Sequence, residues 1–144
     1  MACHIKLIRN ITDYSLDGNV LTINQETAWC EQEGVRRIIE EKFPSIKVYF
    51  KEEESGCGVF YTNDSSGDYF PERYFLDSYE DCEYFETIEE AAKYVSEIVD
   101  HEVEASVNAV SQALDDYIEE HEEDNSDLFY SFHEFTVLES WSER

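Results

Sequence analysis

The sequence predicts an α+β fold, in which an antiparallel sheet carries a shorter helix and one long C-terminal helix on one face. Short alternating segments bounded by turn residues fill the first half, apolar residues recur near every 3.6 positions over 88–121, and one further alternating segment follows. The 144 residues suffice for one core, and no Pro-rich or Ser-rich linker divides them. We therefore predict a single domain over 1–144, with a ferredoxin-like core as a candidate topology.

The beginning of the chain predicts two strands and the shorter helix. Residues 3–9 alternate as a first strand, Asp17-Gly18-Asn19 is a strong turn signal, and 20–23 reads as a returning strand. Either Asn24 or Thr27 can cap a helix, and the apolar residues beyond them recur at helical spacing. This helix should end before Pro44, since proline disfavours helical backbone in the residue that precedes it.

The middle of the chain predicts an antiparallel meander. A turn at 52–56 and a polar loop at 63–68 separate segments that are rich in aromatic and β-branched residues. The expected strands are 46–50, 58–62, 69–76 and 83–85.

Residues 88–121 predict one long helix. Thr87-Ile88-Glu89-Glu90 forms a capping box, and the apolar face continues to Ile118 with no Gly or Pro, although Asp100-His101 could hold a bend. A continuous helix would be about 50 Å long, so one end would project or pack on a partner. Residues 128–138 read as a closing strand.

Negative charge is concentrated in the second half of the chain. The net charge is −25, and residues 74–144 hold 22 Asp and Glu against only Lys93 and Arg144. Residues 1–73 hold 13 acids and 8 bases. An anionic surface of this kind repels nucleic acid and anionic membranes and attracts basic proteins. We therefore expect a basic nucleic-acid-binding protein as partner, with no direct binding to nucleic acid or membrane.

The acids of the expected long helix form a stripe opposite its apolar face. Glu90, Glu97 and Glu104 recur every seven residues, and Asp115 and Glu119 continue nearly in line. Duplex DNA carries one charge per roughly 1.7 Å of its axis, so aligned carboxylates can occupy a site built for phosphates. A merely solvated helix face is the alternative, but such faces usually mix both signs of charge. The candidate partner-binding acids are Glu90, Glu97, Asp100, Glu104, Asp115, Asp116, Glu119, Glu120, Glu122 and Glu123.

An aromatic tract at 69–85 supports a second hypothesis. Aromatic rings beside carboxylates suit arginine, which stacks on a ring while it donates to an acid. The alternation over 69–75 is typical of a sheet core, whereas Tyr79 and Tyr84 lie in an irregular pattern and are candidate partner-binding residues. The chain could thus be a protein-interaction or oligomerisation module; a homodimer is compatible with the sequence.

No catalytic signature is present. The chain lacks GxSxG, P-loop, HExxH and GxGxxG patterns. The polar loop 63–68 lacks the spacing of a calcium loop, and Cys3-His4 with a remote thiol or with His133 lacks the spacing of a zinc site. Cys57 lies between two glycines, which could expose a nucleophile or simply form a tight hairpin. We predict a protein that is not an enzyme and needs no cofactor or metal; a hydrolase or metal-dependent enzyme is the third hypothesis.

The cysteines and the apolar segments indicate a compartment. The four cysteines form no CxxC pair, no signal peptide is evident, and no apolar run approaches the ~20 residues that span a bilayer. A reducing cytoplasm is the expected location.

In size, in charge and in the candidate acids named above, the chain resembles the small acidic proteins that phages and plasmids make against host defences, including DNA-mimic antirestriction and anti-CRISPR proteins. The resemblance covers the second half of the chain and rests on charge, with no motif that can be aligned. It implies a non-enzymatic inhibitor that occupies the basic nucleic-acid-binding groove of a host defence protein.

Overall fold

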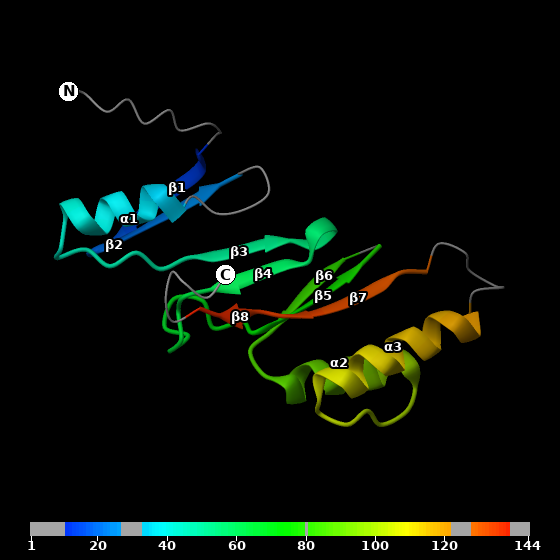
Figure 1. Cartoon of the computed structure of the whole chain (residues 1–144). Coiled ribbons are helices and arrows are strands. Elements are labelled where there is room, and N and C mark those ends of the chain that lie inside the picture. Colours follow the sequence, from blue (N-terminus) through cyan, green and yellow to red (C-terminus); the bar gives the residue numbers. More distant parts are fainter. Residues whose placement is uncertain (1–10, 27–32, 80, 122–127, 139–144) are drawn as a thin grey trace. The chain divides into compact units, whose positions relative to one another are not determined.

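The computed structural model describes residues 11–26, 33–79, 81–121 and 128–138 (Figure 1). The chain divides into two compact units, Met1–Val48 and Tyr49–Arg144, here called unit 1 and unit 2. Helices and mainly antiparallel strand pairs occur together, which confirms the α+β class. The single domain and the ferredoxin-like topology stay predictions.

Unit 1 contains a β-hairpin. Strands β1 (Ile11–Asp17) and β2 (Val20–Gln25) pair antiparallel, and Gly18 closes the turn with a φ of 59° that suits glycine. The predicted turn and returning strand are therefore confirmed, and the strand that pairs with β2 is β1. The strand predicted at 3–9 lies outside the described residues.

The helix of unit 1 is α1 (Glu33–Lys42). Glu33 in its first turn and Lys42 in its last turn complement the partial charges of the helix ends. The helix ends before Pro44, as predicted, and the N–H of Ile46 then donates to the carbonyl of Phe43 across a tight turn. Of the two predicted caps, Asn24 lies in strand β2, so that prediction is wrong, and Thr27 lies outside the described residues.

Unit 2 contains two three-stranded sheets. The strands are β3 (Lys51–Glu54), β4 (Val59–Thr62), β5 (Tyr74–Ser78), β6 (Cys82–Phe85), β7 (Tyr130–Glu134) and β8 (Thr136–Val137), with a short 3₁₀ helix η1 (Ser55–Cys57) between β3 and β4. Sheet B has the order β3-β4-β8, and sheet C has the order β6-β5-β7. The strand pairs of unit 2 are antiparallel, as expected, except that β8 pairs parallel with β4.

Three predicted strand boundaries need correction. In place of the strand expected at 46–50, the structure has β3 at Lys51–Glu54, and its last three residues belong to the segment expected to turn. The aromatic strand begins at Tyr74 and not at 69, because the N–H groups of Tyr69 and Phe70 bind the Asp64 carboxylate and the next residue is proline. The closing strand is interrupted, since Phe135 donates its N–H to the Arg73 carbonyl between β7 and β8.

The single long helix predicted over 88–121 is two helices, α2 (Ile88–Val99) and α3 (Val107–His121). Asp100 ends α2 in the left-handed conformation, with a φ of 55°. Ser96 Oγ then accepts from the N–H of Val103 at 2.9 Å, and Ser106 Oγ accepts from the N–H of Ala109 at the start of α3. Serine side chains therefore accept from two of the backbone N–H groups at the break.

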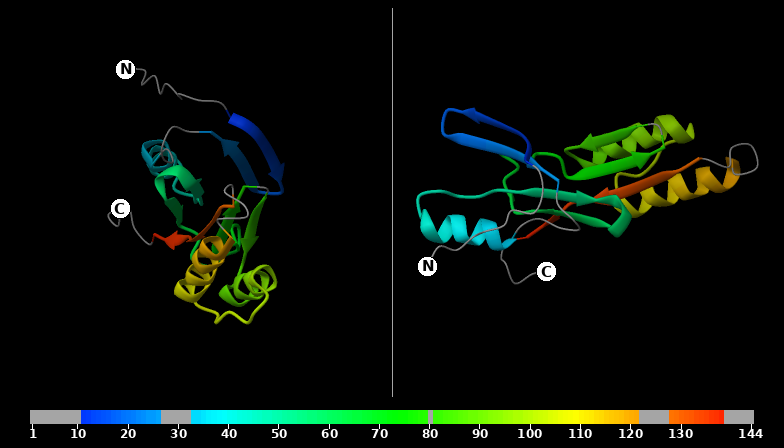
Figure 2. Two further views of the ribbon diagram at one scale, coloured as in Figure 1. Left: turned by 90° about the vertical axis from the view of Figure 1, so that its right-hand side faces the viewer. Right: turned by 90° about the horizontal axis from the view of Figure 1, so that it is seen from above.

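The break allows both helices to bury their apolar faces on one face of sheet C (Figure 2). The two helices contact each other, α2 contacts β6, and α3 contacts β7. This core contains Leu76, Phe85, Ala91, Ala92, Val95, Val110, Ala113 and Leu114. A second buried cluster, Phe60, Phe75 and Phe135, joins β4, β5 and the β7–β8 junction.

The capping box predicted at Thr87 is confirmed. The Thr87 hydroxyl accepts from the N–H of Glu90 at 3.3 Å, and the Glu90 carboxylate accepts from the N–H of Thr87. We expect Thr87→Ala to lower the free energy of unfolding by about 1 kcal/mol. Urea denaturation followed by circular dichroism measures this change. Thr87→Ser retains the oxygen and should stay close to the natural chain; an equal loss in both variants would contradict a capping role.

Candidate protein-interaction site

Eight of the ten candidate acids lie within the described residues, and all eight are exposed. We call them the helix-pair acids: Glu90, Glu97, Asp100, Glu104, Asp115, Asp116, Glu119 and Glu120. Glu122 and Glu123 lie outside the described residues. The base nearest to them in sequence is Lys93 on α2, and no ion pair joins it to an acid of the described residues. Their negative charge is therefore not neutralised within this part of the chain.

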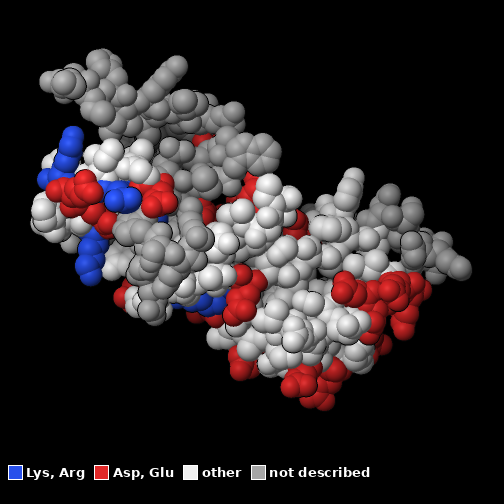
Figure 3. Space-filling view, in the orientation of Figure 1, with Lys and Arg blue, Asp and Glu red and all other residues white. Residues whose placement is uncertain are grey.

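The break between the helices divides the predicted stripe into three groups. Glu90 and Glu97 lie on α2, Asp100 and Glu104 lie on the connection, and the other four lie on α3. The expected alignment of Glu104 with Glu97 along one helix is therefore wrong. Figure 3 shows separate red patches over the α2–α3 region, with uncharged surface between them and no blue among them on the face drawn.

The acids of α3 form the densest group. Asp115, Asp116 and Glu119 lie on the side of the helix opposite the buried Val110 and Leu114, as the helical period requires. Asp116 accepts from the side-chain amide of Gln112 at 2.7 Å, which holds one carboxylate in place. From 115 to 120 the helix rises about 7.5 Å, so four carboxylates lie within a short length of the surface.

The ring of Tyr84, a residue predicted to bind a partner, is in contact with the side chain of Lys51. The Lys51 ammonium lies 4.4 Å from the centre of the Tyr84 ring and 3.4 Å from the Glu72 carboxylate. The Tyr84 hydroxyl donates to Glu53 at 2.8 Å. Burial raises the pKa of Tyr84, and the hydrogen bond and charge of Glu53 raise it further. Lys51 was not predicted as part of a site, although acids and aromatic residues surround it in the sequence.

The rest of the aromatic tract divides between core and surface. Phe75 and Phe85 are buried, as the alternative interpretation expected, and Tyr69 stacks on Tyr49 at 4.6 Å. Tyr79 is 81% exposed beside the β5–β6 turn, where its ring is available for contact. Its predicted role in partner binding stays a prediction.

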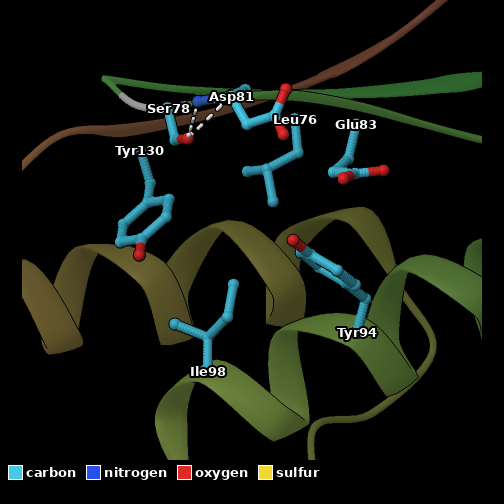
Figure 4. Close-up of a pocket in the computed structure, with 7 residues that line it drawn as sticks. All are labelled: Leu76, Ser78, Asp81, Glu83, Tyr94, Ile98 and Tyr130. Carbon is cyan, nitrogen blue, oxygen red and sulfur yellow. Dashed lines mark hydrogen bonds between the residues drawn. The ribbon is translucent and has the colours of Figure 1, made fainter.

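A cavity of about 290 Å³ lies between sheet C and α2 (Figure 4). Leu76 and Ile98 face each other across it, and the Tyr94 hydroxyl points into it. Its lining residues are Leu76, Ser78, Asp81, Glu83, Tyr94, Ile98 and Tyr130. Two of these are acids and none is a base, so the cavity is electronegative. The expected strand at 83–85 included Glu83, but no sequence signal placed Tyr94 opposite it.

The residues considered above for metal binding and catalysis do not form a metal site within the described residues. No group of three or more His, Cys, Asp or Glu that could hold a metal ion occurs in the described ranges. Asp64 of the polar loop is buried, and its carboxylate accepts from four donors within residues 66–70. Cys57 is an exposed free thiol. His133 stacks on Phe60 at 4.1 Å, while Cys3 and His4 lie outside the described residues.

Comparison of the chain with protein-family models, with curated proteins and with solved structures finds no match in any of the three. Among the described helices, none combines the length and apolar character needed to cross a bilayer.

Proposed function

We propose that this protein is a non-enzymatic acidic inhibitor, which mimics nucleic acid and occupies the basic nucleic-acid-binding groove of a host defence protein. The observation that carries the proposal is the set of exposed helix-pair acids that no base of the described chain neutralises. The free thiols of Cys57 and Cys82 support a reducing cytoplasm as the compartment in which it acts.

Charge density is the physical basis of the proposal. Residues 86–121 carry eleven Asp and Glu, all exposed, and a single Lys. Mutual repulsion among these acids destabilises the compact chain, and a groove lined with Lys and Arg would relieve it on binding. The three groups of acids lie on two packed helices and their connection, so a rigid element presents them to the partner. Separate groups of charge suit a groove that contacts phosphates at several points.

Affinity capture tests the proposal. The chain is immobilised, a host lysate is applied at about 50 mM salt, and bound proteins are eluted with a salt gradient and identified. We expect a basic nucleic-acid-binding protein, whose affinity for the chain falls steeply as salt rises. Added duplex or single-stranded nucleic acid should then release that protein from the chain, because both occupy the same groove.

Two outcomes would contradict the proposal. Binding that persists at high salt would show that the acids contribute little to affinity. A partner that binds nucleic acid and the immobilised chain at the same time would show that the groove is not the contact. In the second case the helix-pair acids would bind a surface other than the groove, and the protein would not be a mimic of nucleic acid.

The exposure of Tyr79 favours one other function, a protein-interaction or oligomerisation module that uses the aromatic tract. In that case Tyr79→Ala would disrupt binding or self-association, whereas removal of helix-pair acids would not. Sedimentation analysis of Tyr79→Ala and of the natural chain distinguishes this function from mimicry.

A further inference from the structure

The cavity between sheet C and α2 is lined by apolar, aromatic, hydroxyl-bearing and acidic side chains. Leu76 is 2% exposed and lies on the sheet side of the cavity, and Ile98 faces it from α2. The Tyr94 ring packs against Phe85 with centroids 5.4 Å apart, and the Tyr130 ring packs against Tyr117 at 6.3 Å. Both tyrosine rings that line the cavity are therefore held in place by a neighbouring aromatic ring.

The two acids of the cavity differ in what surrounds them. Glu83 is paired with Leu76 across β6 and β5, so it lies on the helix side of sheet C, where it is half-buried. Its carboxylate has no hydrogen-bond or ion-pair partner among the described residues. Asp81 is exposed at the β5–β6 turn, where one carboxylate oxygen accepts from the N–H of Cys82. The acceptors of Glu83 are thus available to a ligand.

The negative charges of Glu83 and Asp81 act on Tyr94, which lines the same cavity. Burial raises the pKa of Tyr94, and the charges of Glu83, Asp81 and Glu97 raise it further. The Tyr94 hydroxyl has no hydrogen-bond partner among the described residues. A ligand that filled the cavity without a positive charge would bury Glu83 with no compensating partner, which is unfavourable.

We propose that this cavity binds one arginine side chain of the basic partner protein, with the stem on Leu76 and Ile98 and the guanidinium between Glu83 and Tyr94. The planar guanidinium can donate to a carboxylate in bidentate fashion while it lies against an aromatic ring. The volume is at the lower limit of small-molecule sites, which suits one side chain better than a nucleotide or a large cofactor. The inference rests on the proposed function and adds a specific anchor to it.

The test uses blocked arginine (acetyl-arginine-amide) as the probe, titrated into the full ¹⁵N-labelled chain at low salt. We expect backbone amide shifts at Ser78, Asp81 to Glu83, Tyr94 and Ile98. Blocked citrulline has nearly the same shape without the charge, and it should produce no shifts at these residues. Equal shifts with both probes, or arginine shifts spread evenly over the acidic surface, would overturn the proposal. Binding of spermidine here without binding of blocked arginine would also overturn the assignment to a protein side chain.

Two matched variants separate the cavity from the general charge. Glu83→Gln should raise the dissociation constant of blocked arginine about fivefold. Glu89→Gln removes the same charge from an exposed position on α2 that does not line the cavity, so it should leave the constant unchanged. An equal weakening by both variants would show a nonspecific charge effect. Well-dispersed amide spectra would establish that both variants are folded.

The two proposals fail in different ways. If blocked arginine does not bind in the cavity but nucleic acid still displaces the captured partner, the anchor is wrong and mimicry stands. If blocked arginine binds as expected but no basic nucleic-acid-binding protein is captured, the cavity is a cation site and mimicry is wrong.

Discussion

Charge reversal at four exposed acids is expected to weaken binding of the captured partner about a hundredfold, since each exposed ion pair contributes a factor of roughly two to five and reversal adds repulsion. The variant carries Glu97→Lys, Glu104→Lys, Asp115→Lys and Glu119→Lys, one acid from α2, one from the connection and two from α3. Titration calorimetry at about 50 mM salt measures the dissociation constant. The dependence of affinity on salt should also become shallower, because fewer ionic contacts remain.

The matched control reverses four acids outside the helix pair and changes the net charge by the same amount. It carries Asp17→Lys, Glu26→Lys, Glu41→Lys and Glu54→Lys, all at exposed positions. If the helix-pair acids form the contact, this control should bind within a fewfold of the natural chain. An equal loss of affinity in both variants would mean that overall charge, and not this surface, determines binding. Circular dichroism establishes that both variants retain their helices.

Asp64→Asn is expected to lower the free energy of unfolding by about 3 kcal/mol, because an amide cannot replace both oxygens of a buried carboxylate. One Asp64 oxygen accepts from the N–H of Tyr69 at 2.7 Å and of Phe70 at 2.9 Å. The other accepts from the Ser66 hydroxyl and the Gly67 N–H. The amide nitrogen of Asn would face donors in either orientation. Denaturant unfolding of the two chains measures the difference.

Asp68→Asn is the matched control for this prediction. Asp68 lies in the same loop, but it is exposed, and its contact within the loop is with the Ser66 hydroxyl, whose one proton it shares with Asp64. Its substitution should change the free energy of unfolding by less than about 0.5 kcal/mol. A similar loss in both variants would show that the loop tolerates no change of charge, and that the buried hydrogen bonds of Asp64 are not the cause.

The effect of Asp64 should also depend on pH. Burial raises the pKa of its carboxyl, but the bonds from Phe70, Tyr69, Ser66 and Gly67 together hold it below the ordinary value of 3.8. A group whose pKa is lower in the folded chain contributes its full stabilisation above the unfolded pKa and loses it as pH falls through the folded pKa. The stability difference between the natural chain and Asp64→Asn should therefore be constant near neutrality and shrink below pH 3.8. A difference that stayed constant to lower pH would contradict this linkage.

The sequence predicted best where local chemistry decides the structure. The glycine turn at 17–19, the capping box at Thr87 and the end of α1 before Pro44 each depend on a few neighbouring residues, and each is confirmed. The strand over 69–76 was placed too early because the atoms that hold Tyr69 and Phe70 out of the sheet belong to Asp64, and side-chain alternation does not reveal such a bond.

The long helix was predicted because its apolar period continues across the break. Helices α2 and α3 both bury apolar residues on the same sheet, so one uninterrupted pattern is compatible with one helix or with two. The signals that distinguish them are weak in sequence: Ser96 and Ser106 bond to the backbone of the connection, and Asp100 is not the glycine usually found at a left-handed helix end.

The sequence predicted which acidic residues belong to the candidate site, but it did not predict how they and their neighbours are arranged in space. The exposure of those helix-pair acids that lie on α2 and α3 follows from their position opposite the apolar residues. The cation on Tyr84 and the cavity at Tyr94 were not predictable, because each brings together residues from separate elements. Lys51 and Tyr84 are 33 positions apart, and their contact depends on how β3 and β6 are placed in unit 2.

Strands β7 and β8 complete both sheets of unit 2 from one stretch of eight residues. β7 pairs with β5 in sheet C, and β8 pairs with β4 in sheet B. During synthesis the ribosome makes β4 and β5 long before residues 130–137, so both strands wait with an unpaired edge while the helix pair is translated. Unit 2 therefore reaches its native arrangement only after residues 130–137 have been made, and repulsion among its like charges opposes association of unfinished chains through those edges.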